Sequence, residues 1–248
     1  MNDPIFLRMQ SKAEAKARIQ EAFWPTFAAG AIYVLPITAL TMLSMLLPFV
    51  MENYPIWLDA VLYLVELVFV APLGYGFGLY CVGRSRGMQV SAFAIFEPLG
   101  SLHEFGRALG VSLSMAVRLL PLTVIRMLLI YAVPAESALV AVADILILVV
   151  SLAESCLQLA MSAAYNLIYD DGAIGSWRAV GEGLALYRGR LLSVFTFLFS
   201  FVGWAILASL SMGVLLPYVT AYQSVAFARM TDHLRFPEQD GERPEWPQ

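Results

Sequence analysis

The sequence predicts an all-α protein, a transmembrane bundle of about six helical spans with an amphipathic helix at the membrane interface. Three observations predict this fold. Of the 248 residues, 60% are hydrophobic and only 14% are charged, whereas about 25% are charged in a typical soluble domain. Long stretches carry no charge, and the basic residues are confined to alternate loops. The composition excludes a disordered chain, a coiled coil, a basic nucleic-acid-binding protein and an ordinary soluble enzyme.

Six apolar stretches are long enough to cross a bilayer, which takes about 20 helical residues. No charge occurs in the 30 residues from Ala22 to Met51, or in the 38 residues from Leu191 to Ala228. Because one helix of the second length would measure about 57 Å, nearly twice the hydrocarbon core, we expect a hairpin that turns at Ser211–Gly213. The predicted spans cover residues 22–50, 57–83, 108–133, 137–168, 191–211 and 214–230.

The distribution of Lys and Arg predicts the orientation, because these residues gather in cytoplasmic loops. Thirteen of the 15 basic residues fall on one side of the predicted spans, and the other two lie within the third span. Both termini are therefore expected in the cytoplasm. We expect a cytoplasmic amphipathic arm over residues 1–21, one transmembrane domain over 22–230 and a disordered acidic tail over 231–248. In the arm, Ser11 and Glu14 have capping-box spacing, which predicts that a helix begins there.

The second long cytoplasmic loop contains a predicted interfacial helix, which Asp171 is expected to cap. Its polar face includes Arg178 and Glu182, and its apolar residues recur at helical spacing. We expect the apolar face to lie against the membrane, with its Trp at headgroup level. That face comprises Ile174, Trp177, Val180, Leu184 and Tyr187.

Five ionisable residues fall within the predicted spans, where an ionised group costs about 2.5 to 3.5 kcal/mol. They are Glu66, Arg118, Arg126, Asp144 and Glu154. Since a short turn joins spans three and four, residues at matched depth should pair. This predicts one pair between Arg126 and Asp144 and another between Arg118 and Glu154, with Glu66 at a similar depth to Arg126. Two interpretations remain open: a structural network that fixes helix register, and a polar relay in a transporter.

Small residues recur at helix-packing spacing in two places. Gly74 and Gly78 lie on the second span, and Gly106 and Gly110 lie at the start of the third. Small residues four apart allow helices to approach closely. Because both pairs lie toward the cytoplasmic side, we expect them to face each other.

No pattern in the chain predicts catalysis, a metal site or a cofactor. Metalloprotease, serine-hydrolase and P-loop motifs do not occur. The two histidines, His103 and His233, have no second ligand at metal-binding spacing. Asp170 and Asp171 could ligate a cation, but helix capping explains them better. The sequence therefore predicts a protein that is not an enzyme and binds no nucleic acid.

A segment near the C-terminus is similar to a known family. Its matching features are Phe201-Val202-Gly203-Trp204, then Gly213, then Pro217-Tyr218, then Phe227. The segment resembles the bacterial integral-membrane family called domain of unknown function 975. The resemblance implies a multi-pass protein of the bacterial plasma membrane with no assigned activity, and hence no catalytic residues. A looser similarity links the chain to the membrane domain attached to glycerophosphodiester phosphodiesterases, whose catalytic half has no counterpart here.

Two classes of function follow as expectations. The first is a non-enzymatic scaffold that interacts with the lipid bilayer, a membrane-protein partner or a second copy of the chain. The second is a small transporter or channel component that uses the charges of spans two to four. A dry, paired charge network would favour the scaffold, and a water-accessible cavity that reaches Arg118 and Glu154 would favour transport.

Overall fold

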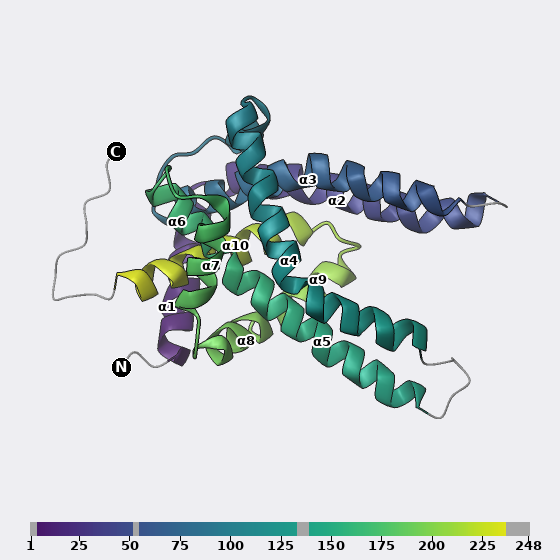
Figure 1. Ribbon diagram of the computed structural model, residues 1–248. Coiled ribbons are helices and arrows are strands. Elements are labelled where there is room, and N and C mark those ends of the chain that lie inside the picture. Colours follow the sequence, from purple (N-terminus) through teal and green to yellow (C-terminus); the bar gives the residue numbers. More distant parts are fainter. Residues whose placement is uncertain (1–3, 52–54, 133–138, 237–248) are drawn as a thin grey trace.

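All regular secondary structure in the described part of the chain, residues 4–51, 55–132 and 139–236 of a computed structural model, is helical (Figure 1). The helices are α1 (Pro4–Glu21), α2 (Phe23–Val50), α3 (Ile56–Ser85), the 3-10 helix η1 (Ala92–Leu99), α4 (Leu102–Ala132), α5 (Val140–Met161), α6 (Ala164–Asp170), α7 (Ser176–Leu186), α8 (Leu191–Phe199), α9 (Val202–Leu210) and α10 (Leu216–Arg235).

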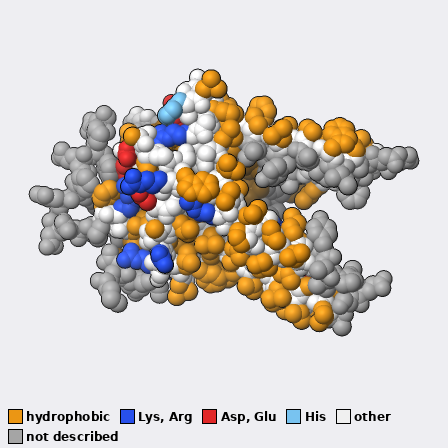
Figure 2. Space-filling view, viewed as in Figure 1, with side chains coloured by type: hydrophobic (Ala, Val, Ile, Leu, Met, Phe, Trp, Pro, Cys, Tyr) orange, Lys and Arg blue, Asp and Glu red, His pale blue; other side chains and the backbone are white. Residues whose placement is uncertain are grey.

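Two long helical hairpins, α2–α3 and α4–α5, project from one end of the molecule and diverge (Figure 1). We call the opposite end the base; it contains α1, α6, α7 and the C-terminal end of α10. Figure 2 shows hydrophobic side chains over the hairpins and most of the visible Lys, Arg, Asp and Glu on the base. This separation is the one expected of a protein whose hairpins face lipid and whose base faces water.

Four helical stretches are long and apolar enough to cross a membrane. They are Phe23–Leu47, Leu102–Ile130, Val140–Asp170 and Leu191–Leu210. The six predicted spans are therefore not confirmed. The predicted second and sixth spans correspond to α3 and α10, and neither is among the four stretches found in the described residues.

Helix α10 lies inside the protein, although its N-terminal part was expected to be a lipid-facing span. It packs on α1, α2 and α3, and its Val225 and Phe227 belong to the main hydrophobic core. Close approach to α2 depends on Gly30, because a Cβ atom there would collide with the backbone carbonyl of Pro217. Contact with protein replaces contact with lipid, which explains how α10 can carry charged residues in its second half.

Helix α4 changes direction part-way along its length (Figure 1). Its first part contacts α7 and η1, and its second part runs beside α5. Pro121 lies within the helix and has no N–H to donate to the preceding turn, a common cause of such bends. The bend places the start of the predicted third span across the base instead of along the hairpin.

The predicted fifth span is interrupted at Ser200–Phe201, which divides it into α8 and α9. Lys12 of α1 donates to the Ser200 carbonyl over 3.1 Å and so satisfies a backbone group exposed by the break. The chain then turns at Ser211–Leu215, where the sequence predicts a hairpin. Gly213 adopts φ +85° in this turn, a conformation that favours glycine.

Within the base, helix α1 packs mainly against α10, with Leu7, Ala15 and Ile19 buried. The capping-box prediction is wrong, because α1 already begins at Pro4 and Ser11 lies within it, donating to the Leu7 carbonyl over 2.8 Å. The predicted tail begins as ordered helix, since α10 continues to Arg235. The rest of the predicted tail, residues 237–248, lies outside the described residues.

Candidate functional site

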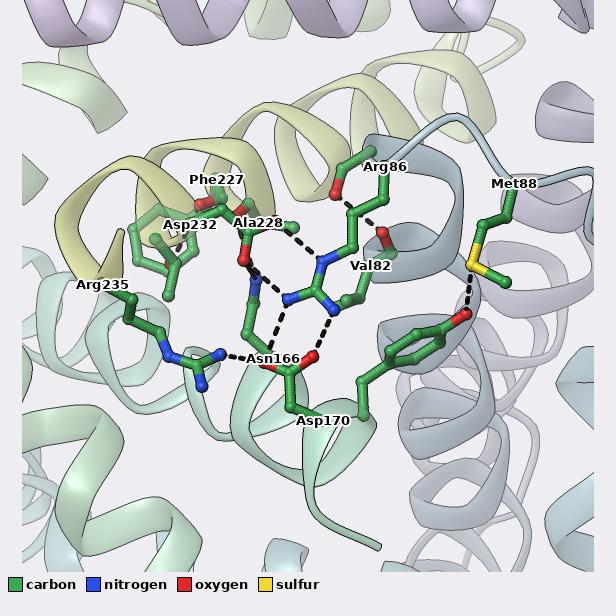
Figure 3. A network of polar contacts seen from close by, with 12 residues as sticks. Val82, Arg86, Met88, Asn166, Asp170, Phe227, Ala228, Asp232 and Arg235 are labelled. Carbon is green, nitrogen blue, oxygen red and sulfur yellow. Dashed lines mark hydrogen bonds and ion pairs between the residues drawn. The ribbon is translucent and has the colours of Figure 1, made fainter. Parts of the chain in front are cut away.

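Arg86, at the C-terminal end of α3, is a buried charged group of the base. Its side chain is only 1% exposed and forms ion pairs with Asp232 of α10 and Asp170 of α6 (Figure 3). The guanidinium meets Asp232 through two bonds, from Nε to Oδ2 at 2.9 Å and from Nη2 to Oδ1 at 2.8 Å. Burial alone would lower the pKa of Arg86, but the hydrogen bonds to Asp232 and Asp170 outweigh it and raise that pKa.

Two further residues complete this cluster. Arg235 pairs with Asp170, and the Asn166 amide donates to the Ala228 carbonyl at 3.0 Å and to Asp232 Oδ1 at 2.9 Å. We refer to Arg86, Asn166, Asp170, Asp232 and Arg235 together as the Arg86 network. It ties the ends of three helices far apart in sequence, and its carboxylates and guanidinium neutralise one another. Such an arrangement holds helices in register and leaves little charge for binding a ligand.

The Arg86 network was missed at the sequence level. The sequence favours a helix cap or a cation ligand at Asp170, whereas its carboxylate pairs with two arginines. Asp171 accepts from the Ala173 backbone at 2.9 Å, while α7 has Gly175 at its N-cap. Among the described residues, no three His, Cys, Asp or Glu side chains gather as metal ligands.

The intramembrane charges pair differently from the prediction. Arg126 Nε lies 3.2 Å from Glu154 Oε2, and Thr123 donates to Glu154 Oε1 over 2.9 Å. The predicted pairs of Arg126 with Asp144 and of Arg118 with Glu154 are therefore wrong. Pairing by matched depth requires a straight third span, whereas the bend in α4 changes its register against α5. Asp144 is exposed on α5.

Arg118 lies on α4 where that helix meets α7. Its guanidinium stands 4.7 Å from the Trp177 ring centre and donates to the carbonyls of Ser114 at 3.0 Å and Trp177 at 3.1 Å. No carboxylate in the described part of the chain pairs with it. The remaining predicted member, Glu66, has a side chain that lies outside those described.

The predicted interfacial helix exists as α7, but most of its apolar face is covered by protein. Val180 and Tyr187 are fully buried, and Ile174 and Leu184 pack against the core formed with α4 and α6. Only Trp177 points outward, with 53% of its surface exposed. The prediction that this face lies on the membrane is thus wrong for four of its five residues, because α4 and α6, and at Tyr187 α10, occupy the place assigned to lipid.

The predicted glycine pairs do not face each other. A Cβ at Gly74 would lie 3.4 Å from the Tyr33 ring of α2, and one at Gly78 would lie 2.5 Å from the Tyr165 ring of α6. A Cβ at Gly110 would come within 3.0 Å of Ser176 at the start of α7, whereas Gly106 has no neighbour within 4 Å. The bend in α4 turns its first part toward α7, away from the glycines of α3.

The residues that resemble the family segment meet where α9 and α10 join. The Trp204 ring lies 5.7 Å from Tyr218 and 6.0 Å from Tyr222, and Gly213 forms the turn between the helices. Pro217 contacts α2 through its carbonyl at Gly30. Gly203 has no neighbour within 4 Å of a built Cβ. The segment therefore has a structural role, placing α10 against α2.

A cavity of about 360 Å³ lies between the two hairpins near the base. Helices α2, α3, α5 and α10 provide most of its wall, and Asn166 of the Arg86 network borders it. None of its lining residues is Lys, Arg, Asp, Glu or His. The cavity does not reach Arg118 or Glu154, the two groups that a charge relay would require.

A family model described as "Protein of unknown function (DUF975)" matches residues 9–230, nearly the whole described chain. The chain belongs to this family. The predicted recognition is therefore confirmed and extends well beyond the last quarter of the chain. The match begins within α1 and ends within α10, so the DUF975 region includes most of both helices. No curated protein and no solved structure matches the chain.

Helices α1 and α10 of this DUF975 protein are joined by a second polar cluster. Glu14 pairs with Arg229 and lies 3.4 Å from His233 Nε2. Burial acts to raise the pKa of Glu14, but hydrogen bonds from His233 and Arg229 outweigh it and lower that pKa to about 2. The carboxylate therefore stays ionised through the acidic range and anchors α1.

Proposed function

We propose that this DUF975 protein is a non-enzymatic, multi-pass scaffold of the bacterial plasma membrane that interacts with lipid. The two hairpins lie in the bilayer, and the base lies in the cytoplasm with both termini. The charge separation in Figure 2 supports this orientation, because basic residues gather on the cytoplasmic side of membrane proteins.

The observation that carries the lipid interaction is the pairing of Arg118 with Trp177 at the edge of the base. Both residues lie where α4 meets α7, and Leu113 and Val117 of α4 have exposed side chains. A cation without a carboxylate partner, stacked on an exposed indole and bordered by apolar side chains, suits a lipid phosphate at headgroup level.

The pairing of Arg126 with Glu154 supports a scaffold over a transporter. Glu154 forms an ion pair with Arg126 and accepts a hydrogen bond from Thr123, and the cavity described above is lined by uncharged residues. A relay would need ionisable groups that face a water-filled path. The alternative of a transporter that uses these charges therefore has no specific observation in its favour.

The test is fluorescence quenching of the protein in vesicles that contain brominated lipids. Replacing zwitterionic by anionic brominated lipid should increase quenching of the Trp177 component, which the Trp177→Phe variant identifies. The Arg118→Gln variant should lose this preference, with anionic lipid bound about five-fold less tightly, because one interfacial cation contributes about 1 kcal/mol.

The matched control is Arg178→Gln on the solvent face of α7, where Arg178 is 75% exposed and bonds Glu182. This variant should behave as the wild type does. Equal preference for anionic lipid in the Arg118→Gln and wild-type proteins would contradict the proposal. A solute flux that Glu154→Gln abolishes without unfolding the protein would support the transporter instead.

A further inference from the structure

The cavity occupies the point where the two hairpins diverge. Along α10 its wall runs from Thr220 to Ala228, and along α3 from Gly74 to Val82, each about 12 Å of helix. Helix α5 forms the opposite wall and packs mainly on α4, α7 and α8. The cavity therefore separates α5 from α3 and α10. The apolar outer parts of the two hairpins continue beyond it, away from the base.

The polar side chains of this wall are uncharged and have unused hydrogen-bonding capacity. Gln158 of α5 and both Thr220 and Gln223 of α10 line the cavity. Within the described ranges, their side chains make no hydrogen bond to the protein. Carboxamides and hydroxyls left without partners near the membrane are costly unless they face water or a ligand. They can donate and accept, which suits a neutral ligand and selects against an ion.

Asn166 provides a fixed acceptor in the same wall. The residue is only 1% exposed, and its two amide hydrogens are used by the Ala228 carbonyl and Asp232. Its orientation is thus set by the Arg86 network, and Oδ1 is left as an acceptor that no donor in the described chain reaches. A carbonyl oxygen held in this way can accept from a hydroxyl or amine donor of a ligand.

The rest of the lining is apolar, which makes the site amphipathic. Phe77, Met115, Leu159 and Leu198 contribute to it, and hydrophobic side chains cover the hairpins (Figure 2). A volume of about 360 Å³ is at the lower end of the range for small-molecule sites. The cavity can hold the polar end of a lipid, while apolar chains would continue along the apolar faces of the hairpins.

We propose that this cavity binds the uncharged, hydroxyl-bearing end of a neutral lipid of the diacylglycerol class. The lipid hydroxyl donates to Asn166 Oδ1, and its ester carbonyls accept from the carboxamides of Gln158 and Gln223. The acyl chains leave between the two hairpins. This inference rests on the proposed function only in placing the hairpins in the bilayer; its residues are distinct from Arg118 and Trp177.

The test is calorimetric titration of the purified full-length protein in lipid-free detergent with dioctanoylglycerol. Glycerol and dioctanoyl phosphatidylglycerol are titrated in parallel, to represent a soluble polyol and an anionic lipid. Dioctanoylglycerol should bind at one site and more tightly than either. The Gln223→Leu variant should bind it at least about five-fold more weakly, since it removes a hydrogen bond to an ester carbonyl. The Thr220→Val variant should also bind it more weakly, since it removes a hydroxyl from the cavity wall.

The matched control is Thr41→Val on α2, where the Thr41 hydroxyl bonds the Ile37 carbonyl outside the cavity. This variant should bind dioctanoylglycerol as the wild type does. Absence of binding, equal binding of glycerol, or tighter binding of phosphatidylglycerol would each overturn the proposal.

A second measurement on the wild type covers the case in which the cavity variants do not fold. A diacylglycerol with a photoreactive group near its glycerol should label α5 and α10 peptides that line the cavity. Labelling confined to the outer faces of α2 and α4 would overturn the assignment. If the wild type shows no Arg118-dependent preference for anionic lipid but binds dioctanoylglycerol, the result counts against the proposed function alone. If it shows that preference but does not bind dioctanoylglycerol, the result counts against this site alone.

Discussion

Replacing Arg86 by Met tests whether the Arg86 network holds the base together. The Arg86 side chain is 1% exposed, and that of its partner Asp232 is 6% exposed, so both lie away from water. The change leaves Asp232 with the Asn166 amide as its remaining donor, while Asp170 keeps Arg235. Removing one partner of a buried ion pair costs about 3 to 5 kcal/mol, mainly because the other charge stays buried.

The assay is SDS-driven unfolding of the purified protein in mixed micelles, followed by circular dichroism. Arg86→Met should lower the free energy of unfolding by about 3 to 5 kcal/mol. The double variant Arg86→Met/Asp232→Leu should be less destabilised than the sum of its single changes, because it leaves no unpaired charge on Asp232. Arg178→Met, at an exposed pair, should cause no measurable change.

Two outcomes would refute this reasoning. A loss under about 1 kcal/mol for Arg86→Met would place the pair among weak, solvent-screened interactions. Strict additivity in the double variant would show that Arg86 and Asp232 do not interact energetically.

Three further predictions use the same unfolding assay. Stability should fall as pH drops from about 4.5 toward 2, because the pKa of Glu14 is lowered on folding. The Glu14→Gln variant should show a weaker pH dependence, and a profile unchanged from the wild type would contradict this prediction. Glu154→Gln should destabilise the protein by about 1 kcal/mol, whereas Asp144→Asn should have no effect, and the opposite order would restore the pairing predicted from sequence. Gly30→Ala should cost about 2 to 3 kcal/mol by separating α2 from α10, whereas Gly106→Ala, with open space around it, should be tolerated; equal effects would contradict the close approach.

The helical class and the turn between the last two long segments could be predicted from the sequence. Both follow from local properties: the charge-free run from Leu191 to Ala228 exceeds one span, and Ser211–Gly213 suits a turn. The number of spans could not be predicted this way. Hydropathy reports only that a segment avoids water, and α10 avoids it by packing against α1, α2 and α3.

The site was harder to predict, because its members meet through tertiary packing. Arg86 and Asp232 are 146 positions apart, and each resembles an ordinary loop or tail charge. The partner of Arg126 was predicted wrongly because the bend at Pro121 alters helix register, an effect that residue counting omits. Gln223 and Thr220 gave no signal in a segment interpreted as a lipid-facing span. A polar stripe on a predicted span is the one clue that could have indicated a cavity.

The central position of α10 has a consequence for biosynthesis. A ribosome completes both hairpins before α10 is made, so α2 and α3 are synthesised before the helix that packs against both of them. Arg86 is likewise synthesised before its partner Asp232, and Glu14 of α1 before its partner Arg229. The base can therefore close only late in synthesis, and a chain interrupted before α10 would expose the charged residue Arg86 without Asp232.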